Sequence, residues 1–479
     1  MSRRPRSIWV GGFAAGVAVC ALLPLTASLA RGETVESALA QAYQNNPTLN
    51  SQRAAVRVTD EGVPQALSGY RPRITVTATG GEQSLSSTSK VVGGTVPPGS
   101  PATYFTQSGY NAPYGAGATI SQTLFNGFQT ANRTRQAESA VRAARATLRL
   151  AEQTVLLNAV TAYMNLLRDT AILDLQRRNV EVLQEQLRQV RDRFNVGEVT
   201  RTDVAQSESR LAAGRSQVLT AEANYKASGA TYRQVIGSNA GKLTPGTPVD
   251  RFSPPNLPGA VGSASAGHPA VTTAEHNVDV AQLQVKVAEG ALYPTVSVQG
   301  NVQKNYMAVG NLNTIESYNA SVLGTLSMPL YQGGAEYSAI RQAKETLGQK
   351  RLDLDTARDQ VRQTVVQSWG QLDAAKSNID ATTAQVQAAE IALNGVREEA
   401  RVGQRTTLDV LNAQQELVNA RVALVTAQRD RVVASYTLLA AVGRLAPEVL
   451  GLHVAVYNAT VHYEQVRDNW AGVRTPDGR

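Results

Sequence analysis

The sequence predicts an α+β membrane protein whose plan is written twice in one chain, with two strand hairpins and two pairs of long helices. Three observations carry this prediction: a recurring turn, four segments of alternating hydropathy, and a stretch from Gln129 to Asn195 without Pro or Gly. Four strands cannot close a barrel, and an open sheet edge is not tolerated in lipid. Several chains must therefore share one barrel, and three chains would give twelve strands.

The first residues form a targeting segment. Three arginines precede an apolar run over 8–25, and small residues end it near Ala30, which is typical of a cleaved secretory signal. A membrane anchor is the weaker interpretation, because the run is short and contains Pro24. The single cysteine, Cys20, lies inside this run, so the mature chain is expected to have no thiol or disulfide chemistry.

Composition narrows the possible partners and functions. The formal charge is +8 from 46 basic and 38 acidic residues, and removal of residues 1–30 lowers it to +5. The charges alternate along the chain without a clustered basic face, so we expect no nucleic-acid partner. Aromatic residues make up only 5%, which suits extended helices better than a large compact core.

The repeat is clearest at two turns, "NVGEVTRTDV" over 195–204 and "RVGQRTTLDV" over 401–410. The glycines of the two turns are 206 residues apart, whereas earlier matches such as Pro72 and Pro294 are 222 apart, so the second copy is shorter by 16. Such self-similarity indicates a duplicated architecture. We predict a signal over 1–30, repeats over 31–240 and 267–446, a Pro/Gly-rich linker over 241–266 and a tail over 447–479.

Each copy is expected to read helix, strand, loop, strand, very long helix, turn, helix. Alternation over about ten residues predicts sheet strands with one apolar and one polar face. The predicted apolar face carries Ile74, Val76, Ala78, Tyr114, Ala116, Ala118, Ile120, Leu124, Val296, Val298, Val302, Tyr318, Ala320, Val322, Leu326, Met328 and Leu330.

Aromatic residues cluster at both ends of the predicted strands, as in the girdles that a bilayer selects. A soluble β-sandwich is the alternative, and its apolar face would be bulkier because it would pack against another sheet.

The helical segments are paired in length. Long helices are predicted over 129–195 and 336–402, and helices of about half that length over 35–67 and 202–236. The last helix carries heptad stripes, for example Ala413, Ala420 and Ala427, and a seven-residue period gives a supercoiled seam. Several stripes indicate neighbours on two sides, as in a wall or tube of helices. An ordinary two- or three-stranded coiled coil is the alternative.

Together the signal, the tandem repeat, the strand hairpins and the "VGxxTxxDV" turns resemble the TolC family of outer-membrane export channels, over about residues 34–450. The tail is similar to those of alphaproteobacterial type I secretion members. The resemblance implies an outer-membrane homotrimer, with a twelve-stranded barrel and a periplasmic tube of twelve helices closed at its tip like an iris. It also implies that the tail lies near the equator of the tube.

The same resemblance implies a function and partners. The trimer would be the exit duct of a tripartite system for type I protein secretion, multidrug efflux or both. Its partners would be outer-membrane lipid, a periplasmic adaptor (membrane fusion protein) and, through the adaptor, an inner-membrane ABC or RND transporter. It would be a conduit and not an enzyme, without cofactor or metal.

The two turns are the candidate functional site. Gly197 and Gly403 are placed to end the long helices in a left-handed cap. Asp203 and Asp409 lie three residues after Thr200 and Thr406, where a carboxylate caps the return helix. By resemblance, the tips dock the adaptor, through Val196, Gly197, Val402 and Gly403.

The resemblance also implies a gate at these turns. Arg405 is similar to a locking arginine, Thr202 and Asp203 to its partner segment on the neighbouring hairpin, and Asp409 to a member of an inward acidic ring. Two positions depart from the family pattern: Asn412 replaces a second ring aspartate, and Ala400 replaces a locking tyrosine. We therefore expect three inward carboxylates per trimer and a shallow closed state, and we expect Asn412→Asp to strengthen cation preference.

Three alternative functions, a periplasmic adaptor, an adhesive coiled coil and an enzyme, predict sequence features that can be checked. A periplasmic adaptor should carry compact lipoyl-type and small barrel domains, for which no block is found. A filamentous or adhesive coiled coil would not need two strand hairpins with aromatic girdles. An enzyme is disfavoured because the four histidines lack metal-ligand spacing and no nucleophile elbow, phosphate loop or HExxH motif occurs.

Overall fold

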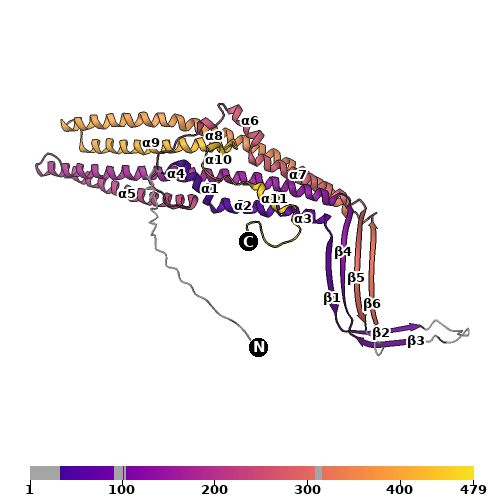
Figure 1. Ribbon diagram of the computed structural model, residues 1–479. Helices are drawn as coiled ribbons and strands as arrows, with labels where there is room; N and C mark the ends of the chain where they lie inside the picture. Colours follow the sequence, from indigo (N-terminus) through magenta and orange to yellow (C-terminus); the bar gives the residue numbers. More distant parts are fainter. Residues whose placement is uncertain (1–32, 91–100, 102–103, 308–314, 479) are drawn as a thin grey trace, which may run out of the picture.

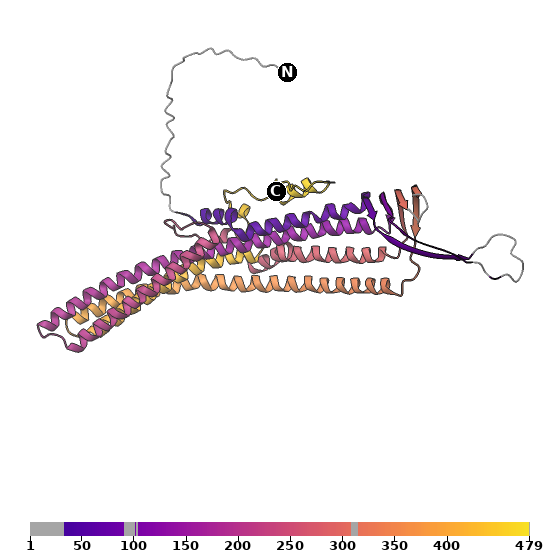
Figure 2. The ribbon, with the colours of Figure 1, turned by 90° about the horizontal axis from the view of Figure 1, so that it is seen from below.

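The computed structural model describes residues 33–90, 101, 104–307 and 315–478. The predicted signal over residues 1–30 lies outside these ranges. Long helices run side by side along most of the molecule, and a narrow sheet extends from one end of the helices (Figure 1). At the opposite end the helices form two hairpins that curve together away from the straight part (Figure 2).

Two long helices are the frame of the molecule. They are α4 (Gln129–Asn195) and α8 (Ala335–Arg401), each 67 residues, or about 100 Å at 1.5 Å per residue. Each turns into a return helix of about half its length, α5 (Arg201–Ile236) and α9 (Thr407–Ala441). The predicted bounds of α4, α5 and α8 agree with the structure to within one residue. Within the described ranges, none of the helices pairs sufficient length with sufficient hydropathy to traverse a bilayer.

The first predicted helix, over 35–67, is divided. The structure has α1 (Val35–Asn45), α2 (Pro47–Asp60) and α3 (Gly62–Leu67), followed by the 3-10 turn η1 (Ser68–Tyr70). Pro47 cannot continue a helix but suits its first position, so the chain restarts there. Asn46 caps the new helix, its Oδ1 accepting from the amides of Thr48 and Leu49 at 3.0 and 3.2 Å.

The segment between the two halves is ordered over its whole length. It contains the 3-10 turn η2 (Asp250–Phe252) and helix α6 (Leu257–Gly267), and leads into α7 (Pro269–Gly290). Arg431 of α9 forms a two-pronged ion pair with Asp250, one arm of which measures 3.1 Å. The linker is thereby fastened to the helices instead of looping free.

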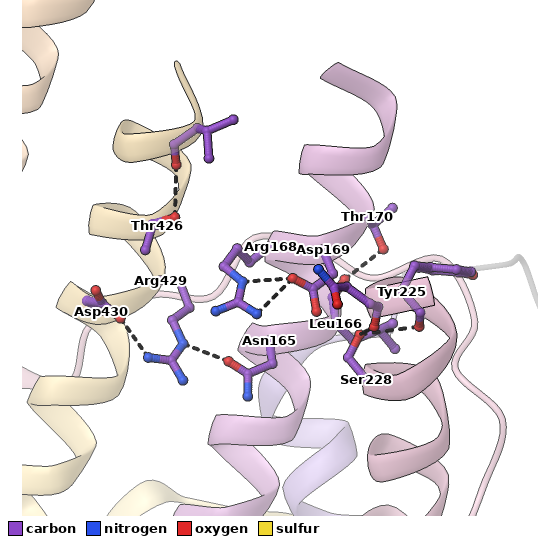
Figure 3. Close-up of polar contacts among 12 residues, drawn as sticks. Asn165, Leu166, Arg168, Asp169, Thr170, Tyr225, Ser228, Thr426, Arg429 and Asp430 are labelled. Carbon is purple, nitrogen blue, oxygen red and sulfur yellow. Dashed lines mark hydrogen bonds and ion pairs between the residues drawn. The ribbon is translucent and has the colours of Figure 1, made fainter. Parts of the chain in front are cut away.

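The main apolar core lies at mid-length, where α1, α4, α5 and α9 meet. Tyr163, Tyr232 and Tyr436 are among its most deeply buried side chains, and Leu39 and Leu156 belong to the same core. The Tyr163 hydroxyl donates to the backbone carbonyl of Glu33, and the Tyr232 hydroxyl donates to the side-chain carboxylate of Glu33. Next to this core, on the side of the hairpins, a polar contact joins two helices: Arg429 Nε of α9 donates to Asn165 Oδ1 of α4 at 2.8 Å (Figure 3).

The four-stranded sheet is antiparallel, in the order β1 (Arg73–Gly80), β4 (Tyr114–Asn126), β5 (Thr295–Met307) and β6 (Ile315–Ser327). Its register places Ile74 opposite Ile120, Ile120 opposite Gly300 and Gly300 opposite Val322. Residues paired across strands share a face, so the apolar positions predicted on the four strands share one side of the sheet, except Leu124. The predicted Met328 and Leu330 lie after the end of β6 at Ser327. Thr75, Thr119, Asn301 and Ser321 share the other.

One predicted facing residue is displaced. The register between β4 and β5 shifts between Thr123 and Phe125, so Phe125 and not Leu124 lies opposite Val296. A bulge inserts one extra residue and resets the alternation after it, which strict counting by twos does not anticipate.

The first hairpin is also longer than predicted. Between β1 and β4 lies a second two-stranded sheet, β2 (Gln83–Lys90) paired with β3 (Tyr104–Asn111), which projects from the far end of the main sheet (Figure 1). The sequence prediction had a loop here, because "QSLSSTSK" has polar residues on both faces and gives no alternation.

The tail after α9 folds back along the first half of the chain. It contains α10 (Pro447–Leu450) and α11 (Ala459–Val466), and α11 packs on α2. Both views place this segment beside α2 and α3, on the way to the sheet (Figures 1 and 2).

Candidate functional site at the hairpin tips

The two tips end their long helices in the same way. Gly197 and Gly403 have φ of +79° and +80°, a conformation that glycine adopts without a Cβ penalty. The amide of Glu198 donates to the carbonyl of Arg193 at 2.9 Å, and the amide of Gly197 to that of Phe194 at 3.0 Å. The second turn repeats both bonds around Gly403, which makes each turn a Schellman cap. The predicted left-handed caps are confirmed.

The return helices begin with matched capping boxes. The Asp203 amide donates to Thr200 Oγ1, and the Thr200 amide donates back to Asp203 Oδ2 at 2.9 Å. Thr406 and Asp409 repeat the pattern, with the Thr406 amide 3.0 Å from Asp409 Oδ2. Hydrogen bonds from Thr200 lower the pKa of Asp203, and those from Thr406, the backbone amide first, lower the pKa of Asp409. Both carboxylates are therefore charged at neutral pH.

Each turn is also bridged by one ion pair, with the charges reversed between the two copies. In the first turn Arg193 of the long helix pairs with Glu198 at 3.0 Å. In the second turn Glu399 of the long helix pairs with Arg405 at 2.8 Å. This contact raises the pKa of Arg405. Within one chain Arg405 thus lies against Glu399, a partner that the sequence prediction did not include, and not against Thr202 or Asp203.

Asn412 joins the two hairpins. Its Oδ1 accepts a hydrogen bond of 2.6 Å from Arg210 on α5. Two residues further along α9, Gln414 is buried and donates to Asn179 of α4 at 3.3 Å. The role of Arg210 was missed because its partner is 202 residues away and the repeat pattern pairs positions within a turn, not across the hairpins.

A groove of about 900 Å³ separates the two tips. Its walls come from both hairpins and include Asp203, Ala400, Gly403 and Arg405. Leu411 lines this groove and also belongs to a small apolar cluster with Leu183, Leu187 and Leu211. Thr202 is exposed beside this groove.

Val196 and Val402 project from the tips, with 72% and 71% of their surfaces exposed. The two tips therefore present a small apolar residue each, on a rigidly capped turn, above a groove with charged walls. These groups suit a contact surface and a set of reversible polar contacts, since exposed ion pairs are weak.

Comparison with known proteins shows which family has this architecture. The family model described as outer membrane efflux protein matches residues 38–238 and 260–444. The chain is 42% identical to the outer membrane efflux protein BepC of Brucella suis, over 95% of both chains. It is 27% identical to the outer membrane protein TolC of Escherichia coli over 61% of this chain and 62% of that protein.

Among solved structures, the outer membrane protein VceC of Vibrio cholerae superposes with a TM-score of 0.68 at 19% identity, covering 85% of this chain and 96% of that one. A membrane protein of Pseudomonas aeruginosa superposes with a TM-score of 0.72 at 17% identity, covering 85% and 93%. Each likeness covers 85% of this chain, so it concerns most of the fold and not a single element.

Proposed function

Because this chain belongs to the outer membrane efflux protein family, we propose that its two hairpin tips are the gated, partner-binding end of an export channel. The protein is the outer-membrane exit duct of a tripartite export system. Three copies of its four-stranded sheet make a twelve-stranded barrel, and the helices continue the barrel as a tube into the periplasm. Because the relatives of this chain are channels, membership of this family does not favour the alternatives of an adaptor or an adhesive coiled coil.

The proposed gate consists of an acidic ring and a lock. Three Asp409 carboxylates, one per chain, converge near the axis and attract cations. Arg405 reaches toward Thr202 or Asp203 of the neighbouring hairpin and holds the helices inward. In support, Arg405 and Asp203 line the same groove, and the lowered pKa of Asp409 keeps it charged. Asn412 in place of a second carboxylate leaves the ring with three charges.

The proposed docking surface is the pair of turns. Val196, Gly197, Val402 and Gly403 would contact a periplasmic adaptor, itself bound to an inner-membrane ABC or RND transporter. The observation that carries this assignment is the exposure of an apolar valine at the apex of each capped turn. A trimer presents six such turns, and together they form a ring to which several adaptor copies can bind.

The docking assignment is tested by Val196→Asp combined with Val402→Asp. Neither substitution touches the Schellman or capping-box bonds, so trimers should form normally. Export should be lost, together with crosslinking of the tip to the adaptor. Val461→Asp, on α11 far from the tips, is the matched control and should export normally. Normal export from the double variant would exclude the turns as the docking surface.

A further inference from the structure

The tail after residue 456 follows the first helices toward the sheet. The amide of Tyr457 donates to the Tyr43 hydroxyl of α1 at 3.2 Å, and the guanidinium of Arg53 lies over both rings. Further on, His462 meets Asp60 at the end of α2, and Asn469 meets Arg71 just before β1. The partners advance along the chain in the same order as the tail, so the tail runs in the direction of the membrane.

A buried contact fixes this path. His462 Nδ1 lies 3.1 Å from Asp60 Oδ2, with Asp60 fully buried and His462 nearly so. The guanidinium of Arg145 on α4 stacks over the adjacent Tyr463 at 5.2 Å. The tail is therefore held on two helices before it reaches the sheet.

Trp470 lies where the tail turns back. Arg71 donates to the carbonyl of Asn469, and its guanidinium lies 4.8 Å from the centre of the Trp470 ring. After Trp470 the chain retreats, because Asp477 pairs with Arg57 of α2 at 3.7 Å. Both Trp470 and the nearby Val473 are open, at 71% and 100% exposure.

The turning point is level with the edge of the barrel. Arg71 precedes Ile74, the first apolar residue of β1, by three residues, or about 10 Å of extended chain. Exposed tyrosines mark the same end of the sheet, among them Tyr70 and Tyr293. Aromatic residues at this height lie at the boundary between hydrocarbon and water, where head groups extend several Å beyond the apolar layer.

We propose that Trp470 anchors the C-terminal tail in the periplasmic leaflet of the outer membrane, by inserting its ring among phospholipid head groups. Indole suits this depth, because its ring is apolar and its N–H finds a polar partner. Arg71 is the positioning residue: it holds the ring through a cation–π contact and presents its charge toward lipid phosphate. Val473 adds apolar surface to the same turn. The occupant is phospholipid because the tail is continuous with the aromatic girdle of the barrel.

The tryptophan content of the chain allows a direct test. Of three tryptophans, Trp9 lies in the predicted signal, which leaves Trp369 and Trp470 in the mature protein. Trp369 packs in the helices, in the middle of α8 and far from the sheet. Wild type and Trp470→Phe, as intact trimers, are reconstituted into vesicles of phosphatidylcholine brominated near the carboxyl end of one acyl chain. Bromine quenches tryptophan on contact, and the difference between the two proteins is the Trp470 emission.

Wild type should lose most of the Trp470 emission relative to vesicles without bromine, whereas Trp470→Phe should show no quenching. Arg71→Leu should reduce the quenching of Trp470 while leaving the trimer intact, because the ring is no longer held at that height. Unquenched Trp470 would overturn the proposal. If it were unquenched but blue-shifted in trimers, the ring would instead be covered by a neighbouring protomer.

Discussion

Arg405 pairs with Glu399 of its own hairpin, yet the gate proposal gives it a partner on the next hairpin, and the two contacts have different consequences. A contact within one hairpin stiffens the turn, whereas a contact between hairpins closes the iris. Arg405→Ser should raise single-channel conductance in a planar bilayer. Glu399→Gln should leave conductance near the wild-type value, because it removes only the contact within the hairpin. If intact Arg405→Ser trimers had unchanged conductance, Arg405 would be an ordinary solvated charge and not a lock.

The capping carboxylates make the tips sensitive to acid. Asp203 and Asp409 have folded pKa values below their ordinary value of 3.8. A depressed pKa contributes stability that is present above the ordinary value and is lost as the pH falls through the folded value. Amides of both turns should therefore lose protection in hydrogen exchange at pH below about 4, after correction for intrinsic rates.

The capping box of α1 is a built-in control for this acid effect, because it uses Thr34 and Ser37 and has no carboxylate. Protection at that helix start should not follow the same pH dependence. Asp409→Asn should abolish the acid step in the second turn only. An identical acid response of α1 would point to general unfolding instead of cap loss.

The structure revises the expected effect of Asn412→Asp. Since Arg210 already donates to this side chain, a carboxylate here would be paired and would add little free charge to the pore. We expect the reversal potential to change less than it does in Asp409→Ala. Arg210→Gln combined with Asn412→Asp should then increase cation preference. A strong increase from Asn412→Asp alone would show that Arg210 leaves the side chain in the trimer.

At the scale of elements, the strand faces define which residues meet lipid. Val298 and Val322 belong to the apolar face, and Ser297 and Ser321 to the polar one. Arginine on the lipid face near the midplane costs about 2–4 kcal/mol, whereas the water-filled side tolerates it. Val298→Arg and Val322→Arg should lower trimer yield, measured by heat-sensitive migration in gels, and Ser297→Arg and Ser321→Arg should assemble. Equal damage from both pairs would make the barrel assignment wrong.

The elements also show which parts of the structure could be predicted from the sequence alone. The ends of the long helices were predictable, because Gly197 and Gly403 carry a specific conformational signal and no other breaker interrupts α4. The break at Pro47 had a visible signal in the preceding Asn46 cap, which the repeat pattern obscured. The path of the tail had no local signal, since His462 and Asp60 are 402 residues apart. Arg405 likewise acquired Glu399 as a partner only once the turn geometry was known.

At the scale of the whole molecule, we expect neighbouring chains to meet at α8, the more exposed of the two long helices. It has the same length as α4, but only 8 of its residues are buried in one chain, against 23 in α4. The open side carries Ile391 at 74% exposure, which a neighbouring protomer would cover. Ile391→Asp should weaken trimers, measured by mass in size-exclusion chromatography. Gln385→Asp, on another side of the same helix, should not. Normal trimers of Ile391→Asp would place the interface elsewhere on α8.

The length of the return helices has a mechanical consequence. α5 and α9 are 36 and 35 residues long, so each reaches from the buried tyrosine core to its tip over a length of about 50 Å. If the helices tilt about the packed cluster of Tyr163, Tyr232 and Tyr436, they move as rigid arms of this length. A tilt of about five degrees there displaces the far end by about 4 Å, while the packed centre hardly moves. We therefore expect small rotations at this distant core to change the width of the proposed aperture. Substitutions in the core should alter single-channel conductance without changing any residue of the proposed gate.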